Sequence, residues 1–202
     1  MGKVNAFACD WVSKELSTCS LGTLLDIGSR NSALPAVLAA AGHDVVSLER
    51  DTNFVDAQKS HMVRHNTSYV IKTGELLHMD IQCKFDYITA IYALQHNVNT
   101  DVECYEMCAT LCNKGLLIVN EYNYSETKYD LGRGDGDMRI YSNSDVCSRI
   151  IDPIVDIKGE DNTFVRAIFA KADFRTQDIA WSNPIHGNIV LISFSFLTGE
   201  QD

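Results

Sequence analysis

The 202-residue chain is 46% apolar and 22% charged, as expected for one globular domain with its own core. Its net charge of −10 and sequence pI near 4.9 argue against a surface that binds nucleic-acid phosphates. No apolar run approaches the ~20 residues of a membrane span, and no signal-peptide pattern opens the chain. With seven cysteines, this favours a reducing, cytoplasmic location.

The first predicted element is an amphipathic helix over Phe7 to Leu16, within residues 1–20. It places four apolar side chains on one side: Phe7, Trp11, Val12 and Leu16. Trp11 is either a core residue or a pocket wall, and the pattern favours the core.

The segment from Leu24 to Asp51 organises the rest of the chain. An apolar run through Ile27 predicts a buried strand, which Gly28 and Ser29 interrupt. Ala33 to Ala41 predicts a helix, with Pro35 in its first turn and Gly42 just past its end. Val45 to Leu48 is a second strand, and it ends at Glu49. This order of strand, turn, helix and strand is typical of one half of a doubly wound nucleotide site.

The residue types at these strand ends indicate the ligand. Gly28 lets the backbone pass close to a bound molecule, and the following helix directs N–H groups toward it. A carboxylate such as Glu49 suits two ribose hydroxyls, which are both donors, so we expect an adenosine derivative. Dinucleotide folds carry G-x-G-x-x-G, but here Arg30 and Ala33 stand at the later glycine positions. The sequence therefore disfavours a pyrophosphate ligand.

The segment Asp26-Ile27-Gly28-Ser29-Arg30-Asn31-Ser32 resembles motif I of the class I S-adenosylmethionine-dependent methyltransferases, an acid, one residue, then Gly-x-Gly-x-Gly. The acid and the first glycine are kept, while Arg30 and Ser32 replace the other two. The resemblance implies S-adenosylmethionine (SAM) as cofactor and S-adenosylhomocysteine (SAH) as product. It implies a cofactor site built from Asp26, Gly28, Ser29, Arg30, Glu49 and Arg50. Arg30 faces the methionine carboxylate or points into solvent.

Two further segments resemble the same family. Gly74-Glu75 follows a predicted strand over Ser68 to Lys72, where family members place an acid that receives the adenine amino group; Leu76 follows it. Phe85 to His96 resembles the fourth strand and its "Leu-x-His" end. The resemblance puts Ile91 and Tyr92 beside the cofactor and Gln95 on the acceptor side, with Tyr92 and His96 at the methyl-transfer point. His96 acts either as a general base or by shaping the pocket, and positioning is favoured.

Successive strands and helices, including a helix over Asp101 to Cys112 and a strand over Leu116 to Glu121, predict a parallel sheet. Helices are expected over Asn143 to Ile151, ended by Pro153, and over Asn162 to Ala172. Strands over Phe174 to Trp181 and Asn188 to Leu197 complete the sheet. The predicted fold is a doubly wound, mostly parallel seven-stranded sheet with a terminal antiparallel hairpin, in three layers.

Residues 122–160 are predicted to be an insertion on the substrate side. Their first half is rich in glycine and charge, and is either a substrate lid over Tyr124 to Tyr141 or an acidic disordered hairpin. The candidate acceptor contacts are Trp11, Gln95, Glu121, Arg139 and Tyr141.

A metal site is not expected. Cys104, Cys108 and Cys112 share one face of a predicted helix but lack a partner pattern, which indicates small buried apolar residues. His61 and His65 lie one turn apart without a third ligand, which indicates a solvated face.

We therefore expect a single-domain methyltransferase, residues 1–202, that uses SAM and methylates a small molecule. Two alternatives remain open: an enzyme that uses SAM for another reaction, and a regulatory subunit that binds SAM or SAH without catalysis. Neither a nucleic acid nor a membrane is an expected partner, and the oligomeric state is open.

Overall fold

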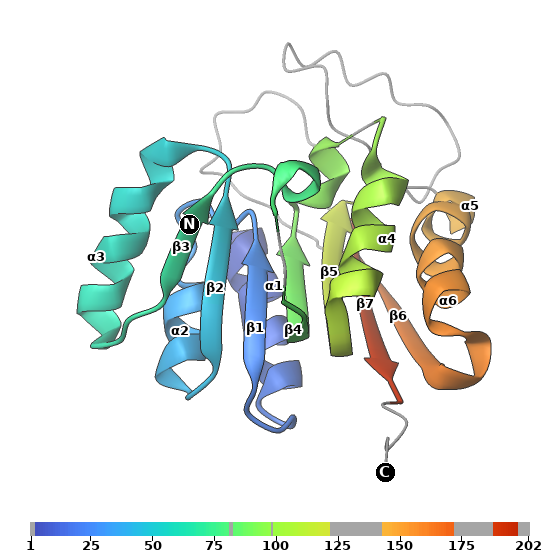
Figure 1. Ribbon diagram of the computed structural model, residues 1–202, viewed down its shortest axis with the longest axis horizontal. Coiled ribbons are helices and arrows are strands. Elements are labelled where there is room, and N and C mark those ends of the chain that lie inside the picture. The colour runs from blue at the N-terminus through green and yellow to red at the C-terminus, as the bar shows by residue number, and fades with distance from the viewer. Residues whose placement is uncertain (1–2, 81–82, 98, 122–142, 172–187, 198–202) are drawn as a thin grey trace.

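The computed structural model describes residues 3–80, 83–97, 99–121, 143–171 and 188–197. These residues build a seven-stranded sheet in the order β3-β2-β1-β4-β5-β7-β6 (Figure 1). The first five strands are parallel, and β7 runs antiparallel to both of its neighbours. The predicted fold class is confirmed. The strands are β1 Thr23–Ile27, β2 Asp44–Glu49, β3 Val70–Thr73, β4 Phe85–Ile91, β5 Cys112–Glu121, β6 Thr163–Lys171 and β7 Asn188–Phe196.

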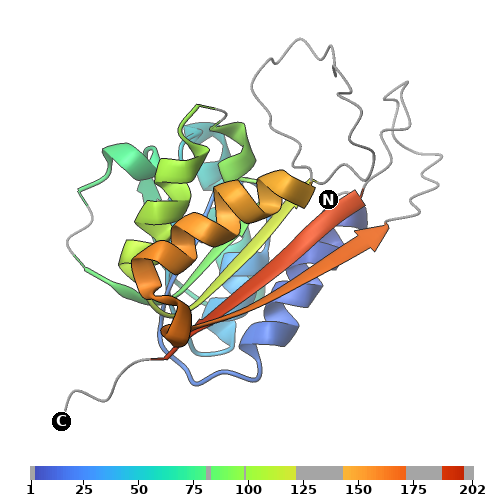
Figure 2. The same ribbon diagram turned by 90° about the vertical axis from the view of Figure 1, so that its right-hand side faces the viewer.

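Helices cover both faces of the sheet, as its three layers require (Figures 1 and 2). One core cluster lies between the sheet and α1 and α2; the other lies between the sheet and α4 with η4 and α6. The helices are α1 Lys3–Leu16, α2 Leu34–Ala40, α3 Val55–His65, α4 Asp101–Leu111, α5 Asn143–Asp145 and α6 Asp152–Lys158. Shorter helical segments are η1 Thr52–Phe54, η2 Leu76–His78, η3 Leu94–His96, η5 Glu160–Asn162 and the π-helical η4 Val146–Ile151.

The N-terminal helix packs on the sheet through a set of residues that differs from the predicted one. Val12 and Leu16 are buried in the core, together with Ala8. Phe7 was expected on the same side but is 45% exposed. The buried residues Ala8 and Val12 are four positions apart and share one face of α1. The exposed Phe7 does not lie on that face.

Pro153 does not end a helix at Ile151, as the sequence predicted. The chain continues from η4 directly into α6, and Pro153 lies in the first turn of α6, where its missing N–H is tolerated. The preceding turns are π-helical, and the N–H of Asp152 bonds to the carbonyl of Cys147. Val146, Ile150 and Ile154 are buried against α4, so residues 143–158 of the predicted insertion belong to the core layers.

The predicted helix over Asn162 to Ala172 is wrong. Thr163–Lys171 is the edge strand β6, paired antiparallel with β7 along its whole length. Phe164 and Ile168, which were expected to point inward, are 63% and 38% exposed, and the side chain of Phe169 lies outside the described residues. The predicted strand over Phe174 to Trp181 also lies outside them. The terminal antiparallel pair is therefore confirmed, with β6 as its first strand.

The three closely spaced cysteines are buried, as expected. Cys104 and Cys108 lie on α4, whereas Cys112 is the first residue of β5 and not a helix residue. Burial raises the pKa of Cys104 to about 11, that of Cys112 to about 12 and that of Cys108 well above its usual value, so all three thiols stay protonated at neutral pH. The described part of the chain holds no cluster of three possible metal ligands, and none of its helices could cross a membrane.

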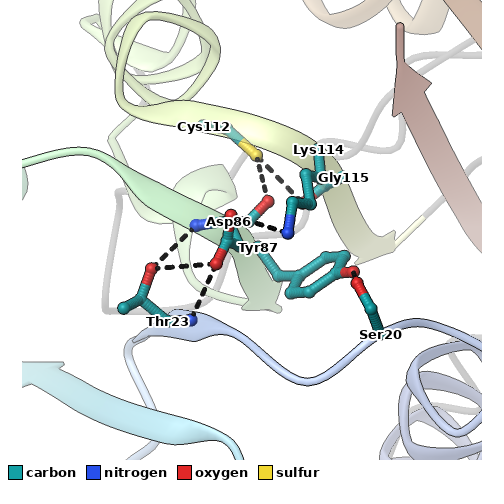
Figure 3. A network of polar contacts seen from close by, with 7 residues as sticks. All are labelled: Ser20, Thr23, Asp86, Tyr87, Cys112, Lys114 and Gly115. Atoms are coloured by element: carbon teal, nitrogen blue, oxygen red, sulfur yellow. Dashed lines mark hydrogen bonds and ion pairs between the residues drawn. The ribbon is translucent and has the colours of Figure 1, made fainter. Parts of the chain in front are cut away.

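Polar contacts connect the first residues of β1, β4 and β5 (Figure 3). They lie at the amino ends of these parallel strands, away from the carboxyl ends. Asp86 accepts hydrogen bonds from the backbone N–H of Thr23, at 3.1 Å, and pairs with Lys114 at 3.1 Å. The Thr23 hydroxyl accepts the Asp86 N–H in return, at 3.0 Å. Partial burial alone would raise the pKa of Asp86, but the bonds from Lys114 and Thr23 outweigh it and lower that pKa.

Replacing Asp86 with asparagine should lower the free energy of unfolding near neutral pH by about 1 kcal/mol, the worth of a partly screened ion pair. Because the folded pKa is lowered, the carboxylate stabilises fully above its unfolded pKa and loses this effect as pH falls through the folded value. Urea unfolding of both proteins across this range measures the difference. Asp44→Asn, at the exposed start of β2, is the control. A loss that persists at low pH would contradict this assignment.

Candidate functional site

A cleft opens at the carboxyl ends of β1, β2 and β4, where ligands bind in open α/β sheets. Its volume is about 730 Å³ when the space open to solvent is included. Of the predicted residues, eight line it: Gly28, Arg30, Glu49, Arg50, Glu75, Leu76, Tyr92 and His96.

Gly28 brings the backbone to the floor of this cleft. Its φ of +72° lies in the left-handed region, and its N–H bonds to the Leu48 carbonyl at 2.8 Å. A Cβ at this position would lie 2.6 Å from the Cβ of Ala93. Only glycine fits both the backbone angle and the space, which explains why the first motif I glycine is kept.

Arg30 takes the position of the second motif I glycine and has a left-handed backbone conformation. Its φ is +49°, which costs a non-glycine residue roughly 1–2 kcal/mol. The Arg30 side chain lines the cleft. Its guanidinium lies over the Phe54 ring, 5.5 Å from the ring centre.

Asp26 and Ser29 hold the turn from below and do not line the cleft. Both are buried, and the Asp26 carboxylate accepts hydrogen bonds from the hydroxyls of Ser29 and Thr89. Ser29 also bonds to Ser47 of β2 at 2.8 Å. Burial raises the pKa of Asp26, the two hydroxyls oppose this, and the charge of Glu49 adds to it. The motif I acid thus connects β1, β4 and the loop.

Glu49 is the most buried acid of the cleft wall, with 3% of its surface exposed. One oxygen accepts the N–H of Arg30 at 2.7 Å, and the other accepts the N–H of Asp51 at 2.9 Å. Each carboxylate oxygen has two lone pairs, so both retain capacity for a further donor. These acceptor oxygens fit the paired hydroxyls of a ribose, which are donors.

Glu75 lies after Gly74 and before η2, at the end of the strand β3 next to β2. Its side chain is 52% exposed and pairs with His78 at 3.3 Å. It lines the cleft next to Leu76, in a position to accept from an amino group.

Tyr92 and His96 close the cleft at the end of β4. Tyr92 has a φ of +52°, and its N–H bonds to the Val119 carbonyl at 2.7 Å, which turns the chain out of the sheet. Burial lowers the pKa of His96, and the charges of Arg30 and Arg50 lower it further. At neutral pH the ring is therefore uncharged and able to accept a proton.

Several predicted residues lie elsewhere. Ile91 and Trp11 pack against the core cluster under α1, and Gln95 is buried in η3. Glu121 ends β5 but its side chain lies outside the described residues, as do Arg139 and Tyr141. None of the lining residues belongs to α2, so the expected contact from its first turn is not among them.

Several lining residues carry little or no signal in the sequence. Ile27, Leu48, Ala93 and Leu94 are apolar residues at strand ends, and their types do not differ from core positions. Asp51 and Asn97 each follow a strand end within a few residues, which was the available signal.

No protein-family model and no curated protein matches the sequence, so the similarities below are structural. TehB from Haemophilus influenzae superposes with a TM-score of 0.70 at 12% identity, over 93% of this chain and 62% of TehB. A SAM-dependent methyltransferase from Clostridium acetobutylicum gives 0.66 at 8% identity, over 94% and 91%. Magnesium protoporphyrin IX methyltransferase from Synechocystis PCC 6803, solved with bound SAM, gives 0.62 at 13%, over 95% and 77%.

These similarities agree with the strand order and with the antiparallel β7 of this chain. The protein has the fold of the class I SAM-dependent methyltransferases.

Proposed function

We propose that the protein binds SAM in this cleft and transfers its methyl group to a small molecule. The observation that carries the proposal is the meeting of Gly28 and the Glu49 carboxylate in one cleft, in a sheet of methyltransferase topology. When bound, SAM supplies a methyl group activated by a sulfonium.

The residues of the cleft divide by their chemistry. Glu49 would accept from the ribose hydroxyls, and Glu75 from the adenine amino group. Gly28 and Arg30 would hold the methionine part. Tyr92 and His96 would shape the space for the acceptor, and the uncharged His96 ring would take a proton from an acceptor that must lose one.

The acidity of the chain supports a small-molecule acceptor over a nucleic acid. Its net charge of −10 would repel a phosphate backbone, and two arginines line the cleft beside three acids. Arg139 and Tyr141 remain predicted acceptor contacts outside the described residues.

Isothermal calorimetry with SAM, SAH and NAD tests the ligand. We expect binding of both sulfur compounds and none of NAD, since the Arg30 side chain stands where a pyrophosphate loop requires glycine. NAD binding without a response to SAH would refute the proposal.

Transfer of label from methyl-labelled SAM to a metabolite extract then separates an enzyme from a regulatory subunit that only binds.

A transfer rate that rises with pH through the lowered pKa of His96 would support its role as a base, and a flat profile would leave it a shaping residue.

A further inference from the structure

The segment 28–32, here called the motif I loop, holds its shape with only one glycine. Backbone hydrogen bonds within it include Ser32 N–H to the Ser29 carbonyl at 2.8 Å. Arg30 nevertheless stays at a φ of +49°. A strained backbone of this kind persists only where the surrounding structure determines it.

Helix α3 supplies two of the groups that determine it. The ring Nε2–H of His61 donates to the Asn31 carbonyl at 3.1 Å, and the Gln58 amide donates to the Arg30 carbonyl at 3.4 Å. Gln58 and His61 are three residues apart, so they share one face of the helix. The sequence predicted a solvated face for His61, but its Nδ1 is buried.

Gln58 is itself held in place. It is fully buried although it is polar, and the Tyr69 hydroxyl lies 3.4 Å from its carbonyl and 3.5 Å from its side-chain oxygen. An amide whose oxygen takes that bond presents its NH₂ to the loop.

These bonds fix the direction of the loop's peptide groups. In a planar trans peptide the N–H points opposite to the C=O. A carbonyl of Asn31 held by α3 therefore turns the Ser32 N–H back into the turn, where it reaches Ser29. On the other side of the loop, the Arg30 N–H is held by Glu49, the proposed ribose acceptor. The loop is thus clamped between α3 and Glu49.

We propose that Gln58 and His61 are positioning residues for cofactor binding. The hydrogen bonds that they donate stabilise the loop conformation, which the two missing glycines would have made easier to adopt. This inference rests on the proposed function. Neither side chain lines the cleft, so each acts on the ligand through the loop.

The test compares His61→Ala with His65→Ala. His65 lies one turn further along α3, and the hydrogen bonds from α3 to the loop come from Gln58 and His61 instead. His61→Gln keeps a donor at similar reach. Hydrogen exchange of the amides of residues 28–33 is measured without ligand, and SAH affinity is measured by calorimetry with the melting temperature alongside. Gln58→Met, which removes the other donor, provides a second variant.

We expect His61→Ala to exchange these amides faster and to bind SAH about fivefold more weakly, which equals about 1 kcal/mol. His61→Gln should restore both, and His65→Ala should match the unmodified protein. Gln58→Met should act in the same direction as His61→Ala.

If the unmodified protein binds SAH and His61→Ala and Gln58→Met bind it equally well, the positioning role is refuted, even where the melting temperature falls. If the unmodified protein does not bind SAH, the proposed function fails and this role fails with it. Unchanged exchange in both variants would refute the clamp by itself.

Discussion

Glu49→Ala should weaken SAH binding by about 1.5–3 kcal/mol, the usual worth of hydrogen bonds to a charged group. The Glu49 carboxylate is almost fully buried in the cleft wall and retains acceptor capacity after binding two N–H groups. Its loss removes the proposed ribose contacts and releases the Arg30 N–H. Calorimetry of the variant beside the unmodified protein measures the change.

Two variants separate these effects. Glu49→Gln keeps an oxygen for one N–H and for one hydroxyl, so its loss should be smaller than that of the alanine variant. Glu75→Ala removes an acid of the same cleft that is half exposed, and screening by water should make its effect smaller still. Unchanged affinity in Glu49→Ala would move the ribose contact to another residue.

Gly28→Ala should lower the free energy of unfolding by about 2–4 kcal/mol and abolish measurable SAH binding. The φ of +72° strains any L-residue, and the new Cβ would lie 2.6 Å from that of Ala93. Relief of that contact requires the end of β4 or the motif I loop to move, and both form the cleft. Urea unfolding and calorimetry measure the two effects.

Gly159→Ala is the matched control. Gly159 also has a positive φ, +86°, but lies between α6 and η5, and its nearest neighbour would be the Asn162 amide at 3.3 Å. This variant should lose about 1–2 kcal/mol of stability and retain full SAH affinity. Reduced affinity in both variants would show that general destabilisation, and not the loop, governs binding.

The parallel part of the sheet could be predicted because buried parallel strands produce continuous apolar runs between glycine-containing turns. Segments such as Leu24–Ile27 and Leu116–Val119 have no helical period. The edge strand β6 could not be distinguished in this way. Residues 163–168 face solvent on part of both sides of β6. The apolar residues of this strand also fit a helix, and pairing with the distant β7 decides its structure.

The site was predictable where polar residues follow strands. Gly28, Glu49 and Glu75 stand at consecutive strand ends, and topology brings such ends together. The roles of Gln58 and His61 could not be predicted, because their contacts depend on how α3 lies against a loop some 30 residues earlier, a relation that no local pattern encodes.

The burial of Cys104, Cys108 and Cys112 has a practical consequence for measuring how the molecule opens. Thiol reagents attack the thiolate, and these three groups are both enclosed and protonated, whereas Cys19, Cys83 and Cys147 are exposed. Under native conditions a disulfide-exchange dye should therefore react quickly with the exposed thiols and slowly with the buried ones. The slow phase would report how often α4 separates from the sheet, without any engineered label.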